Sequence, residues 1–272
     1  MLRYLLPRCR PIALVLALVL AACGQPVATP EPVFLEAAGA MAMAPLVEDL
    51  SAAYHQRSPT VKIGVENPGT WFGLQSLAAG EIDLALAAWL SEPPGPGYKA
   101  TAIARDGLAM VVHPSNPLDG LGLLQLQELF SGRAIHWTAV GGSPAQGTVQ
   151  LISREEGSGS REAFEALVMV DVEVSPLAIV APSSQAVLTY VAGQPDAIGY
   201  VSMSEVSSAV KVLAVEGVLP GTQNTSDGSY ALTHELWLVT REPSPAAVEG
   251  FVEFALSPAG QQIVGRQFGR IR

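Results

Sequence analysis

The regular alternation of short apolar strands with helical segments is the feature that most constrains the fold of this chain. Strand patterns rich in Val, Ile, Leu and Ala occupy residues 33–37, 61–65, 82–86, 108–112, 149–153, 197–201, 210–215 and 236–240. Apolar residues at helical spacing occupy residues 45–56, 74–79, 160–169, 246–256 and 258–267. A strand–helix order of this kind predicts an α/β fold with mostly parallel sheets.

The first 22 residues have the composition of an export signal. Arg3, Arg8 and Arg10 precede an unbroken apolar stretch over residues 11–22. This stretch is shorter than the roughly 20 apolar residues that a membrane-spanning helix needs. A basic start followed by a short apolar region is typical of a signal peptide, so we expect residues 1–22 to be removed.

The sequence directly after this stretch predicts a lipid anchor. Residues 20–23 read Leu-Ala-Ala-Cys, and a pair of small residues ending in cysteine resembles the bacterial lipobox. The resemblance implies cleavage before Cys23 and acylation of its thiol, with more than one acyl chain for stable anchoring. Residues 23–32 contain three prolines and predict a flexible linker. The alternative is a plain secretory signal followed by an incidental cysteine.

Composition limits what the exported part of the chain can be. Cys9 leaves with the signal peptide, so the exported part has no disulfide of its own and depends on its hydrophobic core. Roughly 240 residues are enough for such a core, as one large domain or two smaller ones. Loss of the three leader arginines takes the net charge from −10 to about −13. A surface this acidic argues against nucleic acid as a partner, and an anionic ligand would need aimed donors.

Three strand-to-helix junctions carry groups that can bind an anion. In residues 38–45, Pro45 suits the first turn of a helix, whose free amides attract anions. Residues 67–73 offer the hydroxyl of Thr70. Residues 154–162 combine a guanidinium, two serine hydroxyls and two glycines just ahead of a helix. Such a set can surround a tetrahedral oxyanion with charge-assisted hydrogen bonds.

Structural interpretations of the same residues remain open at this point. Ser160 also fits a helix cap, the two glycines fit a tight turn, and Trp71 fits either a core or the rim of a cleft. The four histidines lie far apart without the spacing of a metal site. The chain has no Walker sequence, Ser158 and Ser160 stand outside any Gly-x-Ser-x-Gly elbow, and no nucleophile–base pair can be placed. An enzyme is therefore disfavoured.

Several segments, in order and spacing, resemble the phosphate-binding substrate-binding proteins of phosphate ABC importers. They occupy residues 106–117, 129–133, 137–142, 154–161, 197–201 and 227–230, and the resemblance extends from about residue 33 to the C-terminus. In that family an Arg-x-x-x-Ser-Gly-Thr/Ser run binds the anion. Arg154, Ser158, Gly159 and Ser160 match this run position by position, which favours anion binding by the third junction.

The resemblance also implies a fold. It is the type II periplasmic-binding-protein fold, in which two α/β lobes are joined by two crossing segments and enclose the ligand in the cleft between them. Lobe one is expected at residues 33–112 plus 209–272, and lobe two at residues 113–208. The expected hinges lie at residues 111–115 and 207–212, and closure around the ligand would be a hinge motion.

Lobe one departs from the family pattern. The family's first loop usually reads Gly-Ser-Thr-Thr, whereas residues 39–42 read Gly-Ala-Met-Ala, which leaves the amides of Met41 and Ala42 as the expected donors. Thr70 aligns with a ligand serine and keeps its hydroxyl. An aspartate that accepts the proton of hydrogen phosphate, and so rejects sulfate, is replaced by Ala88. This loss predicts weaker discrimination between the two anions.

Together these features predict a monomeric, lipid-anchored binding protein on the extracytoplasmic face of a membrane. It would capture phosphate or a similar oxyanion and hand it to the permease subunits of an ABC importer, without a metal or cofactor. Arg154 would neutralise charge, while Ser158, Ser160 and Thr70 donate hydroxyl bonds. Two alternatives remain: the same fold binding sulfate, molybdate, tungstate or an organic phosphonate or sulfonate, and a non-transport signalling or scaffolding role at the cell surface.

Overall fold

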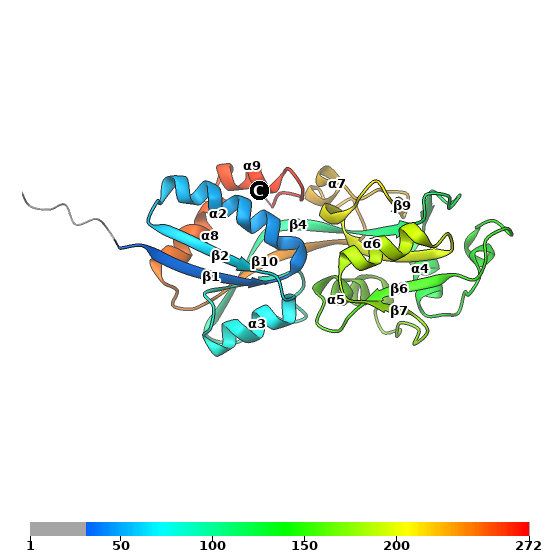
Figure 1. The fold of residues 1–272 in the computed structure, drawn as a ribbon, viewed down its shortest axis with the longest axis horizontal. Coiled ribbons are helices and arrows are strands. Elements are labelled where there is room, and N and C mark those ends of the chain that lie inside the picture. The colour runs from blue at the N-terminus through cyan, green and yellow to red at the C-terminus, as the bar shows by residue number, and fades with distance from the viewer. Residues whose placement is uncertain (1–30, 272) are drawn as a thin grey trace, which may run out of the picture. The chain divides into compact units, whose positions relative to one another are not determined.

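The structure is a computed structural model that describes residues 31–271 of the chain. Residues 1–30 lie outside the described part, and with them the predicted signal peptide and the predicted lipidation of Cys23. Contacts group Val33–Arg272 into one unit, which the following paragraphs describe by itself (Figure 1).

The N-terminal part of this unit is a parallel three-stranded sheet with two crossover helices. Strand β1 (Val33–Gly39) lies between β2 (Val61–Glu66) and β3 (Leu84–Ala87). Helix α2 (Ala44–Arg57) connects β1 to β2 and has its proline in the first turn, as expected. Helix α3 (Thr70–Ala79) connects β2 to β3 and ends at a left-handed glycine. Since crossover connections bring the carboxyl ends of parallel strands to one edge, the loops that begin α2 and α3 lie together.

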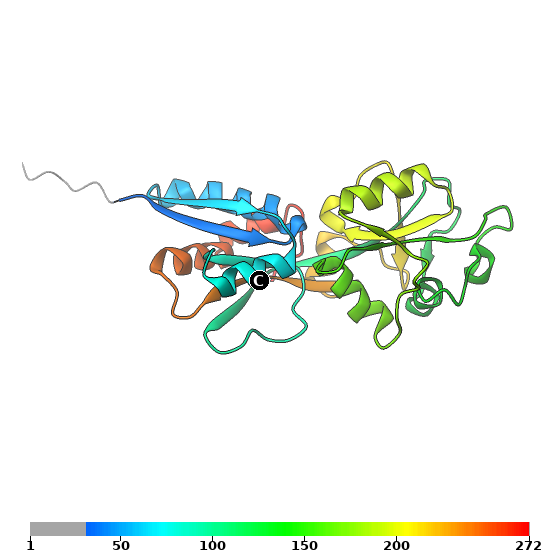
Figure 2. The same cartoon turned by 60° about the horizontal axis from the view of Figure 1, so that its bottom comes forward.

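Two long antiparallel strands carry the sheet from this part into the next. Strand β10 (Thr233–Arg241) pairs with β3 and with the first two thirds of β4 (Tyr98–Val112). The remainder of β4 pairs with β8 (Ala197–Ser202) and β9 (Lys211–Val215). The resulting strand order is β2-β1-β3-β10-β4-β8-β6-β7, which Figures 1 and 2 show as one continuous path between the two halves.

The second half repeats the strand–helix alternation around β6. Strand β6 (Gln150–Arg154) pairs in parallel with β7 (Ile179–Ala181) and β8. The other elements of this half are β5 (Gly120–Leu121), α4 (Leu123–Phe130), α5 (Gly159–Phe164), a π-helical turn over Glu165–Met169, and α6 (Ser184–Gly193). The C-terminal part adds α7 (Thr222–Ser226), α8 (Ala246–Leu256) and α9 (Pro258–Val264).

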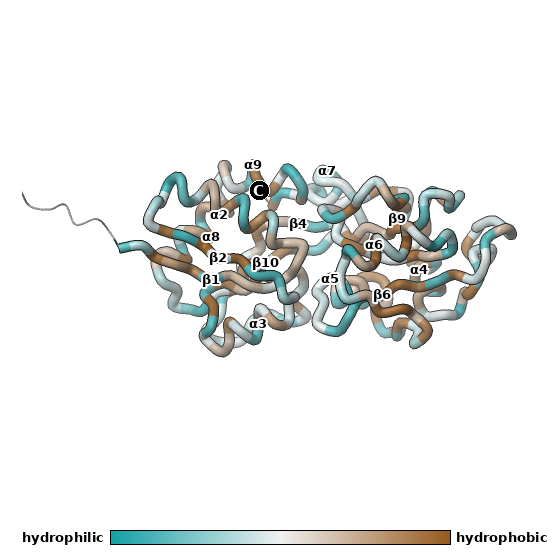
Figure 3. The backbone as a smooth tube through the Cα atoms, viewed as in Figure 1, coloured by the Kyte–Doolittle hydropathy of each residue, from teal (hydrophilic) through white to brown (hydrophobic). Residues whose placement is uncertain are grey.

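Alternating side chains of the strands build separate hydrophobic cores, which define two lobes. In β3, Leu84 and Leu86 face the cluster formed with α2 and α8, while Ala85 and Ala87 face α3. In β4, Leu108, Met110 and Val112 face the cluster that holds α4 and the π-helical turn, while Ala109 and Val111 face α6. Both sheet faces are therefore covered in each lobe, and Figure 3 shows the hydrophobic stretches mainly along the strands.

The lobe boundaries differ from those expected. Leu108 and Leu232 pack into the lobe-two core, whereas Ala104 and Leu236 pack into the lobe-one core. Strand β9 and the segment around Tyr230 and Leu232 therefore belong with lobe two, because β9 adds to the far end of β4 instead of returning to lobe one. The two crossings lie at the paired residues Gly107 and Thr233 of β4 and β10, not at residues 111–115 and 207–212.

The α/β class is confirmed, but parallel pairing is less dominant than expected. Five of the nine strand pairings among the described residues are parallel. The four antiparallel pairings all involve β4 or β10, which cross between the lobes. Within residues 31–271, no helix combines the length and the apolar character needed to cross a membrane.

Candidate functional site

A small pocket lies between the lobes at the carboxyl ends of their parallel strands, where ligands of open α/β sheets bind. Its cavity volume is about 20 Å³, so the lobes leave room there for little more than one water-sized group. We call it the interlobe pocket. Lobe one lines it with Ala40, Met41, Ala42, Gly69, Thr70 and Ala88, and lobe two with Arg154, Glu155, Ser158, Gly159, Ser160, Ser184 and Glu205. All seven residues predicted to bind a ligand line this one pocket, although their roles toward a ligand remain a prediction.

Backbone amides from both lobes line the pocket at the starts of helices. The amides of Met41 and Ala42 begin the short 3-10 turn ahead of α2, and those of Gly159 and Ser160 begin α5. None of these four amides has a hydrogen-bond partner among residues 31–271. Because the first amides of a helix have no partner within it, they form a site of positive partial charge suited to an anion.

Two hydroxyls in the pocket can still donate a hydrogen bond to a ligand. Thr70 is almost fully buried, and its Oγ1 accepts a hydrogen bond from the Ala88 amide at 3.2 Å. Ser158 caps α5 by accepting from the Arg161 amide at 3.4 Å. A hydroxyl that accepts one bond still has its hydrogen to donate, so capping and ligand binding are compatible. The cap is Ser158, not Ser160 as the structural interpretation of this loop proposed.

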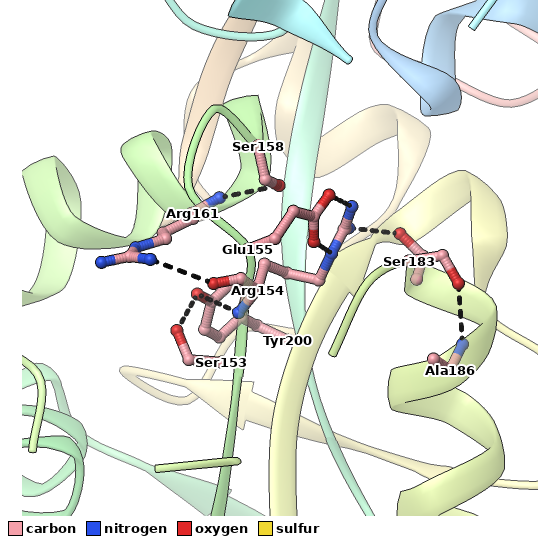
Figure 4. Close-up of polar contacts among 9 residues, drawn as sticks. Ser153, Arg154, Glu155, Ser158, Arg161, Ser183, Ala186 and Tyr200 are labelled. Atoms are coloured by element: carbon pink, nitrogen blue, oxygen red, sulfur yellow. Dashed lines mark hydrogen bonds and ion pairs between the residues drawn. The ribbon is translucent and has the colours of Figure 1, made fainter. Parts of the chain in front are cut away.

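The Arg154 guanidinium is buried and held on two sides. Its Nε and Nη2 donate to the two carboxylate oxygens of Glu155, both at 2.8 Å, and its Nη1 donates to Ser184 Oγ at 2.9 Å (Figure 4). Arg154 is 3% exposed, whereas the Glu155 side chain is 34% exposed. An anion that binds Arg154 must therefore share or replace the contacts of a half-buried carboxylate.

The strand and loop that carry Arg154 are fixed by a second set of contacts. Tyr200 Oη lies 2.8 Å from Ser153 Oγ and accepts from the Arg154 amide at 3.3 Å, and its ring stacks on Phe164 with centroids 4.3 Å apart. Burial raises the pKa of Tyr200 to about 12, so its hydroxyl remains protonated at neutral pH. Arg161 Nη1 donates to the Arg154 carbonyl at 3.3 Å, and Figure 4 shows the contacts of both Tyr200 and Arg161 with Arg154.

Glu205 is a carboxylate in the pocket that sequence reasoning missed. It ends the 3-10 turn Met203–Glu205 that follows β8, and its Oε2 is buried without a hydrogen-bond partner among the described residues. Burial raises its pKa, while a hydrogen bond from Ser184 and the charge of Arg154 act in the opposite direction. Ser184 was also missed. The only sequence signal for either residue is its place just beyond a strand end in lobe two.

Asp106 and His234 form a buried pair behind the pocket, where the two crossing strands meet. Their Oδ2 and Nε2 atoms lie 3.9 Å apart, and both side chains are almost completely buried. Burial raises the pKa of Asp106 to about 7, and the charge of Glu205 adds to the rise. Burial lowers the pKa of His234 to about 4. At neutral pH His234 is therefore uncharged, and Asp106 titrates near neutrality.

The lobes touch directly at the mouth of the pocket. The Trp71 amide donates to the Gly157 carbonyl across the cleft at 3.4 Å. A Cβ atom placed on Gly159 would lie 2.5 Å from Thr70 Oγ1 and 2.8 Å from the Ala88 Cβ. Trp71 is half exposed beside Gly157, which places it at the rim of the cleft and not in a core.

Known proteins match this chain in sequence and in fold. The PBP superfamily domain matches residues 26–259, which is most of the sequence. The chain belongs to the PBP superfamily. Within residues 31–271, no three His, Cys, Asp or Glu side chains are grouped so that they would hold a metal ion.

Within the PBP superfamily, the chain is similar to phosphate-binding proteins. It is 25% identical to the phosphate-binding protein PstS of Bacillus subtilis over 242 residues, covering 87% of this chain and 80% of that protein. It is 35% identical over 132 residues to PstS 2 of Streptococcus agalactiae, and this match spans only 45% of each protein. A putative phosphate ABC transporter substrate-binding protein from Clostridium perfringens, solved with bound phosphate, superposes with a TM-score of 0.80 at 27% identity. That superposition covers 88% of this chain and all of that one.

Proposed function

We propose that this protein captures a small tetrahedral oxyanion, with phosphate as the leading ligand, and delivers it to an ABC importer. The observation that supports this most directly is the convergence, in one small pocket, of Arg154, four unpartnered amides and hydroxyls that still have a hydrogen to donate, from both lobes. The donors surround the pocket from two sides, as a tetrahedral anion requires. Relatives named as phosphate-binding proteins, and a similar fold solved with phosphate bound, make phosphate the first candidate.

The pocket would hold the anion by directed hydrogen bonds, since the chain is acidic overall. Each hydrogen bond to a charged group contributes roughly 1.5–3 kcal/mol. The amides of Met41, Ala42, Gly159 and Ser160 have fixed directions because their backbones are parts of helix starts. A preorganised set of this kind binds an anion without a large cost of ordering the protein.

Closure of the two lobes would complete the site. Donors on lobe one and donors on lobe two contact one anion only when the lobes meet, as they do at Trp71 and Gly157. The crossing residues Gly107 and Thr233 lie between the two cores and are the natural hinge. Anchoring through Cys23 would keep such a protein close to its permease, which raises the effective concentration of the complex.

Calorimetric titration with phosphate, sulfate, molybdate and tungstate tests the proposal. We expect the unsubstituted protein to bind phosphate and Arg154→Ala to lose nearly all affinity, because the buried guanidinium is the one full positive charge among the described pocket residues. Arg133→Ala is the matched control, since Arg133 is an exposed arginine of lobe two that pairs with Glu128 on the surface and lies outside the pocket. If no oxyanion binds, or if Arg154→Ala binds as tightly as the control, the proposed function is wrong.

The location is tested separately. Cys23→Ala should release the protein from the membrane fraction and abolish metabolic labelling with a radioactive fatty acid. Labelling that persists in this variant would contradict the anchor without affecting the ligand.

A further inference from the structure

The interlobe pocket contains two carboxylates but only one full positive charge among its described lining residues. An anion site with this composition needs an explanation, because a carboxylate beside a bound anion repels it. The two carboxylates differ in their contacts. Both oxygens of Glu155 accept hydrogen bonds from Arg154, so neither faces a ligand unpaired. Glu205 has a buried Oε2 that accepts no hydrogen bond from residues 31–271.

Burial raises the pKa of Glu205, and two neighbouring groups act against that rise. Ser184, which accepts from Arg154 Nη1, hydrogen-bonds to Glu205, and the charge of Arg154 also favours the ionised form. The other ionisable groups near it are Glu155 in the same pocket and Asp106 behind it. Across the pocket, lobe one presents the Thr70 hydroxyl, backbone amides and the methyl group of Ala88, but no carboxylate.

We propose that Glu205 makes the interlobe pocket selective for an oxyanion that carries a proton, by accepting a hydrogen bond from the hydroxyl of the anion at its Oε2. This inference rests on the proposed function, because it assigns a role toward the same ligand. It runs against the expectation that the replacement of an aspartate by Ala88 weakens discrimination between phosphate and sulfate. The acceptor is supplied by lobe two instead of lobe one.

The selectivity follows from the cost of an unpaired buried acceptor. Hydrogen phosphate retains a proton at neutral pH and satisfies Oε2, so that the hydrogen bond offsets the repulsion between the two charges. Sulfate has no proton at this pH, and its lone pairs would face those of Oε2 without a hydrogen between them. A site built to pair with a ligand hydroxyl rejects an analogue that lacks it by about 10⁴-fold or more. Glu205 therefore excludes sulfate by repulsion as well as selecting phosphate by attraction.

The test compares phosphate and sulfate binding by the unsubstituted protein, Glu205→Gln and Glu155→Gln, using calorimetry at pH 7.5. The two variants each remove one negative charge from the same pocket, so they change the long-range field equally. Glu205→Gln replaces the acceptor with an amide that can donate to sulfate. We expect its phosphate-to-sulfate affinity ratio to fall by about 100-fold or more, with a gain in sulfate affinity. Glu155→Gln releases Arg154 and should raise the affinity for both anions, with a ratio within about threefold of the original.

Each outcome decides the inference. A ratio that collapses in Glu205→Gln alone supports it. An unchanged ratio in Glu205→Gln, or a collapse in Glu155→Gln instead, overturns it. Unsubstituted protein that binds sulfate as tightly as phosphate overturns the inference but leaves the proposed function intact, whereas binding of no oxyanion overturns both. Thermal unfolding midpoints check the fold, and Glu205→Ala, which also removes the acceptor, gives the same readout if the glutamine variant does not fold.

Discussion

Substitution of Gly159 by alanine should prevent the two lobes from closing on a ligand. The added Cβ would lie 2.5 Å from Thr70 Oγ1 and 2.8 Å from the Ala88 Cβ. Both atoms belong to lobe one, whereas Gly159 begins α5 of lobe two. Ordinary van der Waals contact starts near 3.4 Å, so the lobes must separate by roughly 1 Å. The backbone of Gly159 is compatible with alanine, because the residue is the first of a helix.

A separation of this size breaks hydrogen bonds that bridge the ligand. Thr70 is the lobe-one hydroxyl closest to Gly159, and an anion held by lobe two would lose at least its contact. One hydrogen bond to a charged group is worth roughly 1.5–3 kcal/mol, which corresponds to an affinity about 10- to 100-fold lower. Calorimetric titration with phosphate measures this loss. The unfolding free energy without ligand should remain unchanged within about 0.5 kcal/mol, because the open protein avoids the clash.

Gly193→Ala is the matched control for this experiment. Gly193 is the last residue of α6 in the same lobe, and a Cβ atom there meets nothing within 4 Å. The control should bind phosphate with the original affinity. If Gly159→Ala also binds phosphate with that affinity, the contact of Gly159 with Thr70 and Ala88 is not part of the bound state and the closure argument fails.

Two further predictions concern the supports of the pocket. The raised pKa of Asp106 stabilises the folded state below about pH 4, and this stabilisation is lost as the pH rises through about 7. Asp106→Asn removes this pH-dependent contribution. The unfolding free energy of the variant relative to the unsubstituted protein should therefore increase between pH 4 and 7, by about 4 kcal/mol at most, in denaturant titrations; a constant difference would contradict the assigned pKa. Tyr200→Phe leaves Ser153 and the Arg154 amide unpaired and should cost about 1–3 kcal/mol of unfolding free energy. Tyr190→Phe removes a hydroxyl that bonds, among the described residues, only to half-buried Gln150, so it should cost less, and equal losses would refute the assignment.

The parts of the site that sequence predicted best are those confined to a single short loop. Arg154, Ser158, Gly159 and Ser160 lie within seven consecutive residues between a clear strand and a clear helix, so their proximity needs no tertiary information. Thr70, Met41 and Ala42 also follow strands of a parallel sheet, and the rule that such loops share an edge brings them together. The α/β class followed from the same alternation of strands and helices.

The parts that sequence missed depend on contacts between distant segments. Glu205 comes 51 positions after Arg154 and reaches the pocket only because β8 lies beside β6 in the sheet. Strand β9 was expected in lobe one, but it pairs with the end of β4 in lobe two. The residues of β9 alone do not determine which sheet edge the strand joins. Residues 98–107 were not expected to be a strand, although apolar residues occupy alternate positions from 98 to 104. Three of these four are alanine, which is depleted in strands, and the pairing with β10 decides their structure.

The opposite situations of the two pocket carboxylates explain how an acidic chain can hold an anion. Arg154 is buried, and a buried guanidinium left without a counter-charge costs roughly 3–5 kcal/mol. Glu155 supplies that charge from a half-exposed position, so its exchange for a bound anion returns a carboxylate to water at a cost of about 1 kcal/mol or less. The Glu205 carboxylate cannot be displaced into water in this way, because its Oε2 is buried and has no access to solvent. The anion must therefore satisfy Glu205 itself, and only an anion with a proton does so. Affinity in this pocket depends on the carboxylate that can leave, and selectivity depends on the carboxylate that cannot.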